Sequence, residues 1–178
     1  MKSIETERLI LRSWTPTDLH DFYEYAKNPN VGPKAGWSPH QSKEESKQIL
    51  NMFIEGESHN RAIVLKTSNQ VIGSIEARKD PYRKRSTAVN IGYVLSFGHW
   101  NKGIMTEALN GLLHHLFTEE HIDIVSIEHA ISNYASQKVI LKNGFIHEGT
   151  LRKATVFEGE IDSCHVYSMT KDEWKNLK

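Results

Sequence analysis

A strand followed at once by a loop and a helix creates a candidate anion site between residues 90 and 106. From residue 90 the segment reads Asn-Ile-Gly-Tyr-Val-Leu-Ser-Phe-Gly-His-Trp-Asn-Lys-Gly-Ile-Met-Thr. The first N–H groups of a helix lack partners within the helix and lie at the positive end of its dipole, so a phosphate is favoured there. Gly103 lets the backbone approach an anion closely, and Lys102 adds a positive charge. Taken alone, the pattern also fits an ordinary strand-to-helix turn.

A second polar pair, Asn133 and Ser136, stands at the start of a later helix. Residues 133–145 read NYASQKVILKNGF and follow a segment with strand character. Each residue alone has a structural explanation, Asn133 as an N-cap and Ser136 as a first-turn residue. The two segments occur in the same strand–helix order, and together they indicate more than two ordinary helix starts.

The two segments together resemble the GNAT superfamily of acetyltransferases. The first is similar to its pyrophosphate-binding motif, in which a strand, a loop, a glycine and a helix of the Thr-Glu-Ala-Leu type (residues 106–109) follow one another. The second is similar to the family's Asn-x-x-Ser-x-x-Val-x-x-Lys-x-Gly-Phe element. The opening TERLILR (6–12) and the closing VYSMTKDEW (166–174) resemble the branch of ribosomal-protein N-terminal (alanine/serine) acetyltransferases. The resemblance covers essentially the whole chain.

The resemblance implies acetyl-CoA as co-substrate, bound where two neighbouring strands separate. Backbone groups near Val94 and Leu95 are then expected on the pantetheine arm, together with the Asn133 side chain. Ser136, one helical turn on, is expected to donate a proton or a hydrogen bond to the leaving thiolate. The pyrophosphate is expected on the loop made by Trp100, Asn101, Lys102, Gly103, Ile104, Met105 and Thr106.

The base that removes the amine proton is open between Glu76, His129 and a water relay. The ordinary pKa of histidine suits proton removal near neutral pH. Both residues also have structural explanations, as a strand residue for His129 and as part of a solvated strand face for Glu76. Because strand side chains alternate, either Glu128 or His129 faces the strand gap, but not both.

Several positions depart from the family pattern. Trp100 cannot supply the cationic or amide side chain usual there, and Met105 is larger than the usual Gly or Ala, although backbone donors can still bind phosphate. Asn90 stands where relatives often carry Glu, and it cannot act as a base. Asp162 lies one place before the Asp that often follows the last hairpin.

The elements that must position these residues alternate between strands and helices. Helical patterns follow Thr15, Ser42 and Gly103, and another begins at Ser132 or Asn133 and ends at Leu141. Strand patterns cover 7–14, 61–67, 70–78, 87–96, 123–131, 145–157 and 161–170. The order β-αα-βββ-α-β-α-ββ predicts an α/β fold with a mixed central sheet and helices on both faces, formed by residues 1–178 as one domain. The resemblance adds the expectation that two strands of this sheet splay apart.

Composition narrows the functional classes. Lys plus Arg and Asp plus Glu both number 22, so no strong basic field points to nucleic acid or to an anionic membrane. No segment approaches the ~20 apolar residues of a membrane span. Cys164 is the only cysteine, which favours a reducing compartment, and we expect a cytoplasmic protein. No His/Cys cluster has zinc spacing, so no metal is predicted.

The acceptor and partners stay open at this point. The main hypothesis is the amine of a peptide N-terminus, in particular that of a ribosomal protein. A small amine, such as a polyamine, an aminoglycoside or a toxic aminoacyl compound, is the alternative within the same fold. A non-catalytic acyl-CoA-binding module is a third reading, which Asn90 keeps open. The chain is expected to act as a monomer or homodimer.

Overall fold

The fold is built on one eight-stranded sheet with the order β1-β2-β3-β4-β5-β6-β8-β7. The computed structural model describes residues 1–56, 59–84 and 87–177. The strands are β1 (Ile4–Glu5), β2 (Leu9–Arg12), β3 (Asn60–Leu65), β4 (Val71–Lys79), β5 (Ala88–Leu95), β6 (Ile124–Ala130), β7 (Ile146–Phe157) and β8 (Glu160–Thr170). The β5–β6 pair is parallel, and the other strand pairs of the described chain are antiparallel. The predicted α/β fold with a mixed sheet is confirmed.

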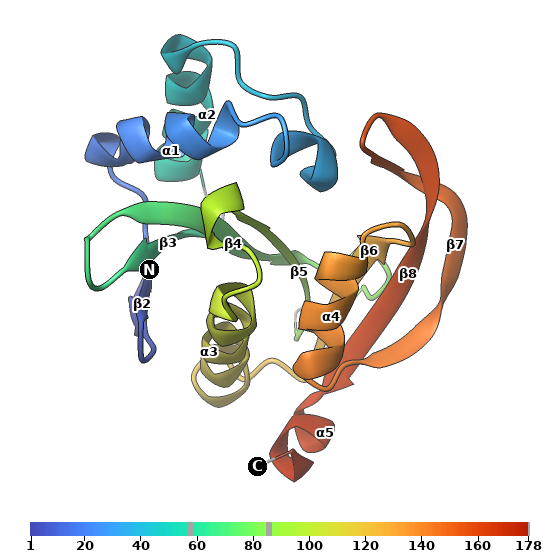
Figure 1. The fold of residues 1–178 in the computed structure, drawn as a ribbon. Coiled ribbons are helices and arrows are strands. Elements are labelled where there is room, and N and C mark those ends of the chain that lie inside the picture. Colours follow the sequence, from blue (N-terminus) through green and yellow to red (C-terminus); the bar gives the residue numbers. More distant parts are fainter. Residues whose placement is uncertain (57–58, 85–86, 178) are drawn as a thin grey trace.

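Helices cover both faces of this sheet (Figure 1). The α-helices are α1 (Leu19–Ala26), α2 (Lys43–Glu55), α3 (Ile104–Thr118), α4 (Tyr134–Lys142) and α5 (Lys171–Asn176). Short 3₁₀ turns are η1 (Pro16–Asp18), η2 (Gly32–Ala35) and η3 (Phe97–His99). Helices α1 and α2 lie on one face of the sheet, and α3 and α4 lie on the other.

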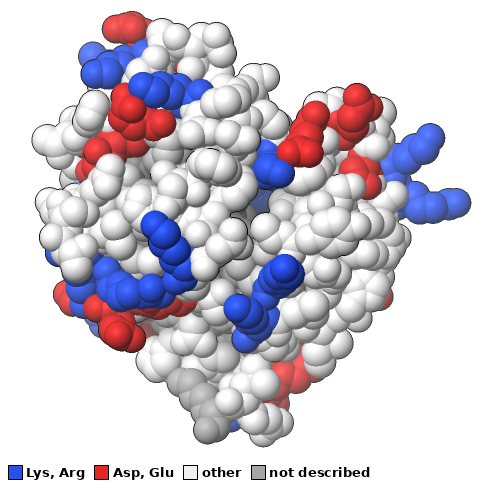
Figure 2. Space-filling model, in the orientation of Figure 1, with Lys and Arg blue, Asp and Glu red and all other residues white. Residues whose placement is uncertain are grey.

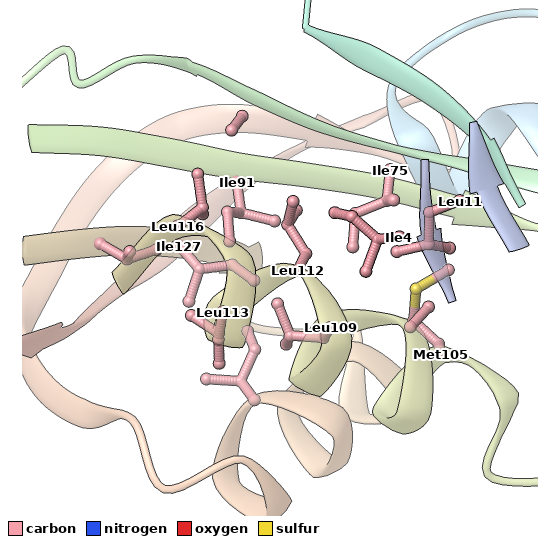
Figure 3. Close-up of a cluster of buried hydrophobic side chains, with 14 of the residues drawn as sticks. Ile4, Leu11, Ile75, Ile91, Met105, Leu109, Leu112, Leu113, Leu116 and Ile127 are labelled. Carbon is pink, nitrogen blue, oxygen red and sulfur yellow. The ribbon is translucent and has the colours of Figure 1, made fainter. Parts of the chain in front are cut away.

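The larger core forms between the sheet and α3. In Figure 3 the apolar side of α3 points at the strands, with Leu109, Leu112 and Leu116 packed toward Ile75 and Ile91. These side chains recur every three or four residues along the chain, so they share one helix face and are buried together. This packing fixes α3 against the strand from which its N-terminal loop emerges.

The smaller core lies on the opposite face and combines aromatic with aliphatic side chains. Phe22 and Tyr25 of α1 pack there with Leu50 of α2, and Trp14 closes the end of the cluster. The ring centroids of Trp14 and Phe22 are 5.3 Å apart. This smaller core holds α1 and α2 over the middle of the sheet.

Strands β5 and β6 separate partway along their length. They pair from Ala88 to Ile91 on β5 and from Ile124 to Ile127 on β6, and the pairing ends there. Beyond that point β5 stays bonded to β4, and β6 stays bonded to β8. The sheet therefore has a gap between residues 92–95 and residues 128–130.

One strand and one helix were not predicted from the sequence, and one predicted strand was too long. β1 has only two residues in a polar segment, too short for a periodic pattern. α5 follows β8 without a break, although Thr170 and Glu173 form a capping box that the sequence carries. The first predicted strand, 7–14, is shorter in the structure, where β2 covers Leu9–Arg12. The expected loop around residues 29–39 contains the turn η2.

Candidate functional site

Two cavities open at the gap between β5 and β6 and meet there. The smaller has a volume of about 370 Å³ and lies along the starts of α3 and α4. The larger, of about 570 Å³, extends under α1, α2 and the β7–β8 hairpin. Figure 2 shows the surface hollowed near the centre of this face, with Lys and Arg atoms on both sides of the hollow. Residues common to both linings are Lys34, Ala35, Tyr93, Val94, Asn133 and Ser136.

The start of α3 forms one end of the smaller cavity. Gly103, the N-cap residue, has a left-handed φ of 73°, and Asn101 has a φ of 59°. Among the described residues no side chain caps this helix, which leaves N–H groups of its first turn unpaired, and Gly103, Ile104, Met105 and Thr106 place this turn in the lining of the cavity. Unpaired N–H groups and the helix dipole together make an anion site.

A clamp from the N-terminal segment holds the first turn of α3. Glu107 accepts a hydrogen bond of 2.6 Å from the Thr6 hydroxyl and bonds of 2.8 Å and 2.6 Å from the Arg8 backbone N–H and Nε. Burial alone raises the pKa of Glu107, but these bonds outweigh it and lower that pKa. Arg8 Nη1 also donates to the Lys102 carbonyl at 3.0 Å, which ties the loop to the same clamp.

Helix α4 supplies the opposite wall of the smaller cavity. Ala135, Lys138, Val139 and Lys142 line it, and their spacing of three and four residues places them on one helix face. Both lysines are exposed, and neither has an ion pair within the described residues. Neither cation was assigned a role from the sequence, where Lys142 appears only as the Lys of the family element that begins at Asn133. The helical spacing of both lysines from Asn133 and Ser136 was the available signal.

The residues predicted to bind the coenzyme, except Lys102, line the smaller cavity. Lys102 Nζ instead donates to the Gly98 carbonyl at 2.7 Å. Trp100, which departs from the family pattern, donates its indole N–H to the Leu95 carbonyl at 2.8 Å. The Leu95 carbonyl is thus already bonded, and Trp100 braces the loop against the end of β5.

Asn133 and Ser136 come together at the start of α4. Asn133 caps the helix by accepting a hydrogen bond of 3.1 Å from the Ser136 backbone N–H. The Ser136 hydroxyl lies 2.8 Å from the hydroxyl of Tyr93 on β5. Burial raises the pKa of Tyr93, so its hydroxyl stays protonated. The sequence analysis did not single out Tyr93, although it follows Ile91 at the strand period of two.

Two carboxylates flank one guanidinium in the larger cavity. Arg78 Nη1 lies 3.2 Å from Glu76 and Nη2 lies 3.5 Å from Glu128, and both carboxylates are about one quarter exposed, at 28% and 27%. The Tyr82 hydroxyl bonds the other oxygen of Glu128. Gly92 allows this arrangement, because a Cβ there would lie 3.1 Å from Glu76 Oε1.

Asn90, at the position where relatives often carry Glu, joins three strands. Its side-chain oxygen accepts a hydrogen bond of 3.0 Å from Arg78 Nε, and its Nδ2 donates to Ser126 Oγ at 2.9 Å. Asn90 is fully buried. It therefore orients Arg78, and the carboxylates of this region stand on the flanking strands instead.

His129 lines the larger cavity but is buried, at 4% exposure. Its Nδ1 lies 2.7 Å from the Ala130 carbonyl, so Nδ1 carries the proton, and its Nε2 lies 3.4 Å from the Tyr167 hydroxyl. Burial lowers the pKa of the ring. Glu128, the preceding residue, bonds Arg78 on the sheet face that also carries Glu76, so the two neighbours point to opposite faces of β6. Both nevertheless line the larger cavity, contrary to the expectation that only one of them would face the gap, because the sheet is open there.

Asp162 supports the loop that precedes α4. Its side chain accepts hydrogen bonds from the Ser132 N–H at 3.0 Å and from the Ser163 N–H at 2.7 Å. The carboxylate thus fixes the turn that carries Asn133. Its displacement by one place from the family pattern still leaves it within reach of this backbone.

The turn η2 bridges the tip of the β7–β8 hairpin and the start of α4, and its bonded residues Pro33, Lys34 and Glu158 are called the strap below. The Glu158 N–H at the tip of the β7–β8 hairpin donates to the Pro33 carbonyl at 2.9 Å, and the Glu158 carboxylate pairs with Lys34 at 2.7 Å. Asn133 Nδ2 lies 3.5 Å from the Lys34 carbonyl. The turn η2 is therefore held against both the hairpin and the start of α4.

Comparison with known proteins gives consistent matches. Residues 8–146 match the acetyltransferase (GNAT) domain family. An uncharacterized N-acetyltransferase of Bacillus licheniformis is 25% identical over 178 residues, covering 98% of this chain and 99% of that protein. A ribosomal-protein-serine acetyltransferase of Escherichia coli (strain K12) is 27% identical over 135 residues, 74% of each protein. A ribosomal L7/L12 α-N-protein acetyltransferase solved in complex with coenzyme A has a TM-score of 0.80 at 22% identity, covering 97% of this chain and 99% of that chain.

No helix among the described residues is long and apolar enough to cross a membrane. No group of three or more His, Cys, Asp or Glu side chains in residues 1–56, 59–84 and 87–177 is arranged to hold a metal ion.

Proposed function

The chain belongs to the GNAT acetyltransferase family, and we propose that its acceptor is a primary amine, in particular the N-terminal amine of a protein such as a ribosomal protein. Residues 1–178 act as one catalytic unit in the cytoplasm, with acetyl-CoA as the acetyl donor. The meeting of the two cavities at Tyr93, Val94 and Ser136 is the observation that carries this proposal. A thioester reaching that point from one cavity faces an amine arriving from the other.

The smaller cavity fits the coenzyme. The N–H groups at the start of α3 suit a pyrophosphate, and Lys138 and Lys142 add positive charge from the opposite wall. Asn133 and the β5 backbone near Val94 lie between this phosphate end and the gap. They hold the pantetheine arm so that the acetyl group lies beside Ser136.

Ser136 assists the leaving group. As the amine nitrogen bonds the acetyl carbon, the carbon–sulfur bond breaks and the sulfur takes up negative charge. Ser136 donates a hydrogen bond or its proton to that sulfur. The protonated Tyr93 hydroxyl, 2.8 Å away, donates a hydrogen bond to Ser136 Oγ, so the serine proton points at the sulfur while Tyr93 keeps its own proton.

Glu76 is the base that we favour over His129. The ring nitrogens of His129 already face the Ala130 carbonyl and the Tyr167 hydroxyl. Glu76 is partly exposed in the larger cavity, where an amine enters, and Asn60 and Arg78 hold its carboxylate. Glu76 takes the amine proton directly or through one water, and Glu128 stands on the other side of Arg78 as a second carboxylate.

Protein N-termini are supported as acceptors by the ribosomal-protein-serine acetyltransferase among the relatives. A small amine is the second candidate. It is favoured by the strap of Pro33, Lys34 and Glu158, which narrows the outer side of the larger cavity. A flexible N-terminal segment can still pass such a strap, whereas a side-chain amine on a folded surface cannot.

A thiol-release assay with acetyl-CoA tests the proposal. The panel pairs a peptide bearing a free N-terminal Ser or Ala with the same peptide blocked at its N-terminus, and adds a polyamine. Release that depends on the free N-terminus supports the proposal. Release with the polyamine alone favours the second candidate, and no release with any acceptor contradicts amine transfer.

A further inference from the structure

The hydroxyl of Tyr25 on α1 is buried in the wall of the larger cavity, beside the hydroxyl of Ser74. Tyr25 is 4% exposed and lines the cavity, and its hydroxyl makes no hydrogen bond of acceptable geometry within the described residues. Buried polar groups in native proteins almost always have a partner. Burial also raises the pKa of Tyr25, so the hydroxyl keeps its proton and remains a donor.

Ser74 places this hydroxyl close to the point where the cavities meet. Ser74 lines the same cavity, and its hydroxyl acts on Tyr25 as a hydrogen-bond donor that lowers the pKa of the phenol, which leaves the Tyr25 proton itself without an acceptor among the described residues. Ser74 is paired with Val94 across the β4–β5 ladder, and Val94 lines both cavities. Neighbouring strands are about 4.8 Å apart, so the Ser74 backbone lies one strand spacing from Val94, where the two cavities meet.

Aromatic rings surround Tyr25, and the nearby Asp18 carboxylate adds to the rise in the pKa of its hydroxyl. The Phe22 ring lies 5.4 Å from Tyr25 and 5.4 Å from His40, and Trp37 lies 5.2 Å from His40. His40 Nδ1 lies 2.7 Å from Ser46 Oγ, and burial lowers the pKa of His40, which keeps the ring neutral near pH 7. The Tyr25 hydroxyl is thus a donor among aromatic rings, and a second ammonium, which has no acceptor atom, cannot satisfy it.

We propose that Tyr25 is a specificity-determining residue that donates its hydroxyl proton to an oxygen of the acceptor molecule, a few bonds from the reacting amine. The first carbonyl of a peptide has this relation to the N-terminal amine, and so does the carbonyl of a small amino-acid amide. The inference rests on the proposed function, since it names a feature of the amine substrate. A site built to bond a substrate oxygen discriminates strongly against an analogue without it.

The test compares two variants on two acceptors that differ in the carbonyl. Alaninamide carries the oxygen next to its amine, and sec-butylamine lacks it. The variant is Tyr25→Phe, and the matched control is Tyr23→Phe, which removes a hydroxyl from the same helix at a residue that lines neither cavity. An alanine-initiated peptide is added to distinguish a peptide from a small amide as the source of the oxygen.

Tyr25→Phe is expected to lower kcat/KM for alaninamide by about tenfold or more and to change kcat/KM for sec-butylamine by less than about threefold. For each acceptor the kcat/KM of the variant is divided by that of the parent, so the different basicities of the two amines cancel. Equal losses on both acceptors, or no loss on either, overturn the inference while leaving amine transfer intact. No turnover of any acceptor by the parent, with acetyl-CoA still raising the melting temperature, overturns both the inference and the proposed function.

Discussion

The hydroxyl of Tyr93 on β5 lies 2.8 Å from Ser136 Oγ at the start of α4. The two residues come from elements on opposite sides of the sheet gap, and both line the two cavities. A tyrosine that stays protonated behind a serine leaves the serine proton free to point at a ligand. We propose that the carbon–sulfur bond of acetyl-CoA breaks beside this pair.

Replacing Ser136 by Ala should lower kcat and leave acetyl-CoA affinity nearly unchanged. A general acid contributes about 10²–10⁴ in rate, and the variant removes only the hydroxyl. Steady-state kinetics with saturating acceptor measures the loss. Ser132→Ala, which removes a hydroxyl outside both cavities, is the control and should stay near the parent rate. A loss below about threefold for Ser136→Ala reduces Ser136 to a first-turn residue of α4.

Gly103→Glu should abolish the rise in melting temperature that acetyl-CoA causes by mass action. The new carboxylate stands at the start of α3 and repels the phosphates, and Gly103 has a left-handed φ of 73° that glutamate adopts poorly. Gly98→Glu is the matched control in the same loop, because no atom lies within 4 Å of a Cβ built there. Binding as tight in Gly103→Glu as in the parent contradicts the assignment of the phosphate site.

Glu76→Gln should lower kcat/KM by about 10²–10⁴, because an amide cannot accept the amine proton. We expect kcat/KM to rise with pH through an inflection as the catalytic base loses its proton. His129→Ala should leave this inflection in place, since the His129 nitrogens face the Ala130 carbonyl and the Tyr167 hydroxyl. Rates are measured across pH with one acceptor. The acceptor amine also titrates, but it adds the same inflection to the profile of every variant. Loss of the inflection in a folded His129→Ala that still binds acetyl-CoA makes His129 the base.

Some residues of the site could be predicted from the sequence and others could not, and the difference has physical reasons. The helix starts at Gly103 and Asn133 were visible because glycine, capping side chains and apolar periodicity are local signals. Tyr93 and Arg78 were given no role in the site, and Glu128 was named only as the alternative to His129, because their roles depend on partners on other strands. His129 and Glu128 show the limit most directly. Strand alternation requires them to point to opposite faces, but only the structure tells which one joins Arg78.

The strand gap was expected from the family resemblance and has no signature of its own in the sequence. It depends on where β5 leaves β6 and stays with β4. Gly73 permits a close approach at that point, because a Cβ there would lie 2.4 Å from the Val94 carbonyl oxygen. Such a contact joins residues of different strands, so a single glycine in a strand pattern indicates it only in general form.

Acid should weaken the fold partly through Asp18. Burial alone raises the pKa of this carboxyl, but hydrogen bonds from Arg12 and from the Thr15 N–H outweigh it and hold that pKa below its ordinary 3.8. The native state thus favours the ionised form, and this stabilisation is complete above about pH 4 and is lost as pH falls through the lowered pKa. The free energy of unfolding, measured by urea denaturation, should fall over that window.

Asp18→Asn should cost about 2 kcal/mol near pH 7, since it weakens a charge-assisted bond to a partly buried Arg12, and should flatten the acid dependence. Glu160→Gln is the control, because Glu160 is exposed and makes no ion pair within the described residues. An acid dependence as steep in Asp18→Asn as in the parent contradicts this role for Asp18.

Location of the transferred acetyl group tests the central claim most directly. The protein is incubated with acetyl-CoA and a peptide that carries a free N-terminal Ser or Ala and one internal Lys, and tandem mass spectrometry locates the acetyl group. The account predicts one acetyl group on the N-terminal amine, formed by the parent and strongly reduced in Ser136→Ala. An unmodified peptide, in the presence of acetyl-CoA that the protein demonstrably binds, would contradict the account and indicate an acyl-CoA-binding module without transfer activity.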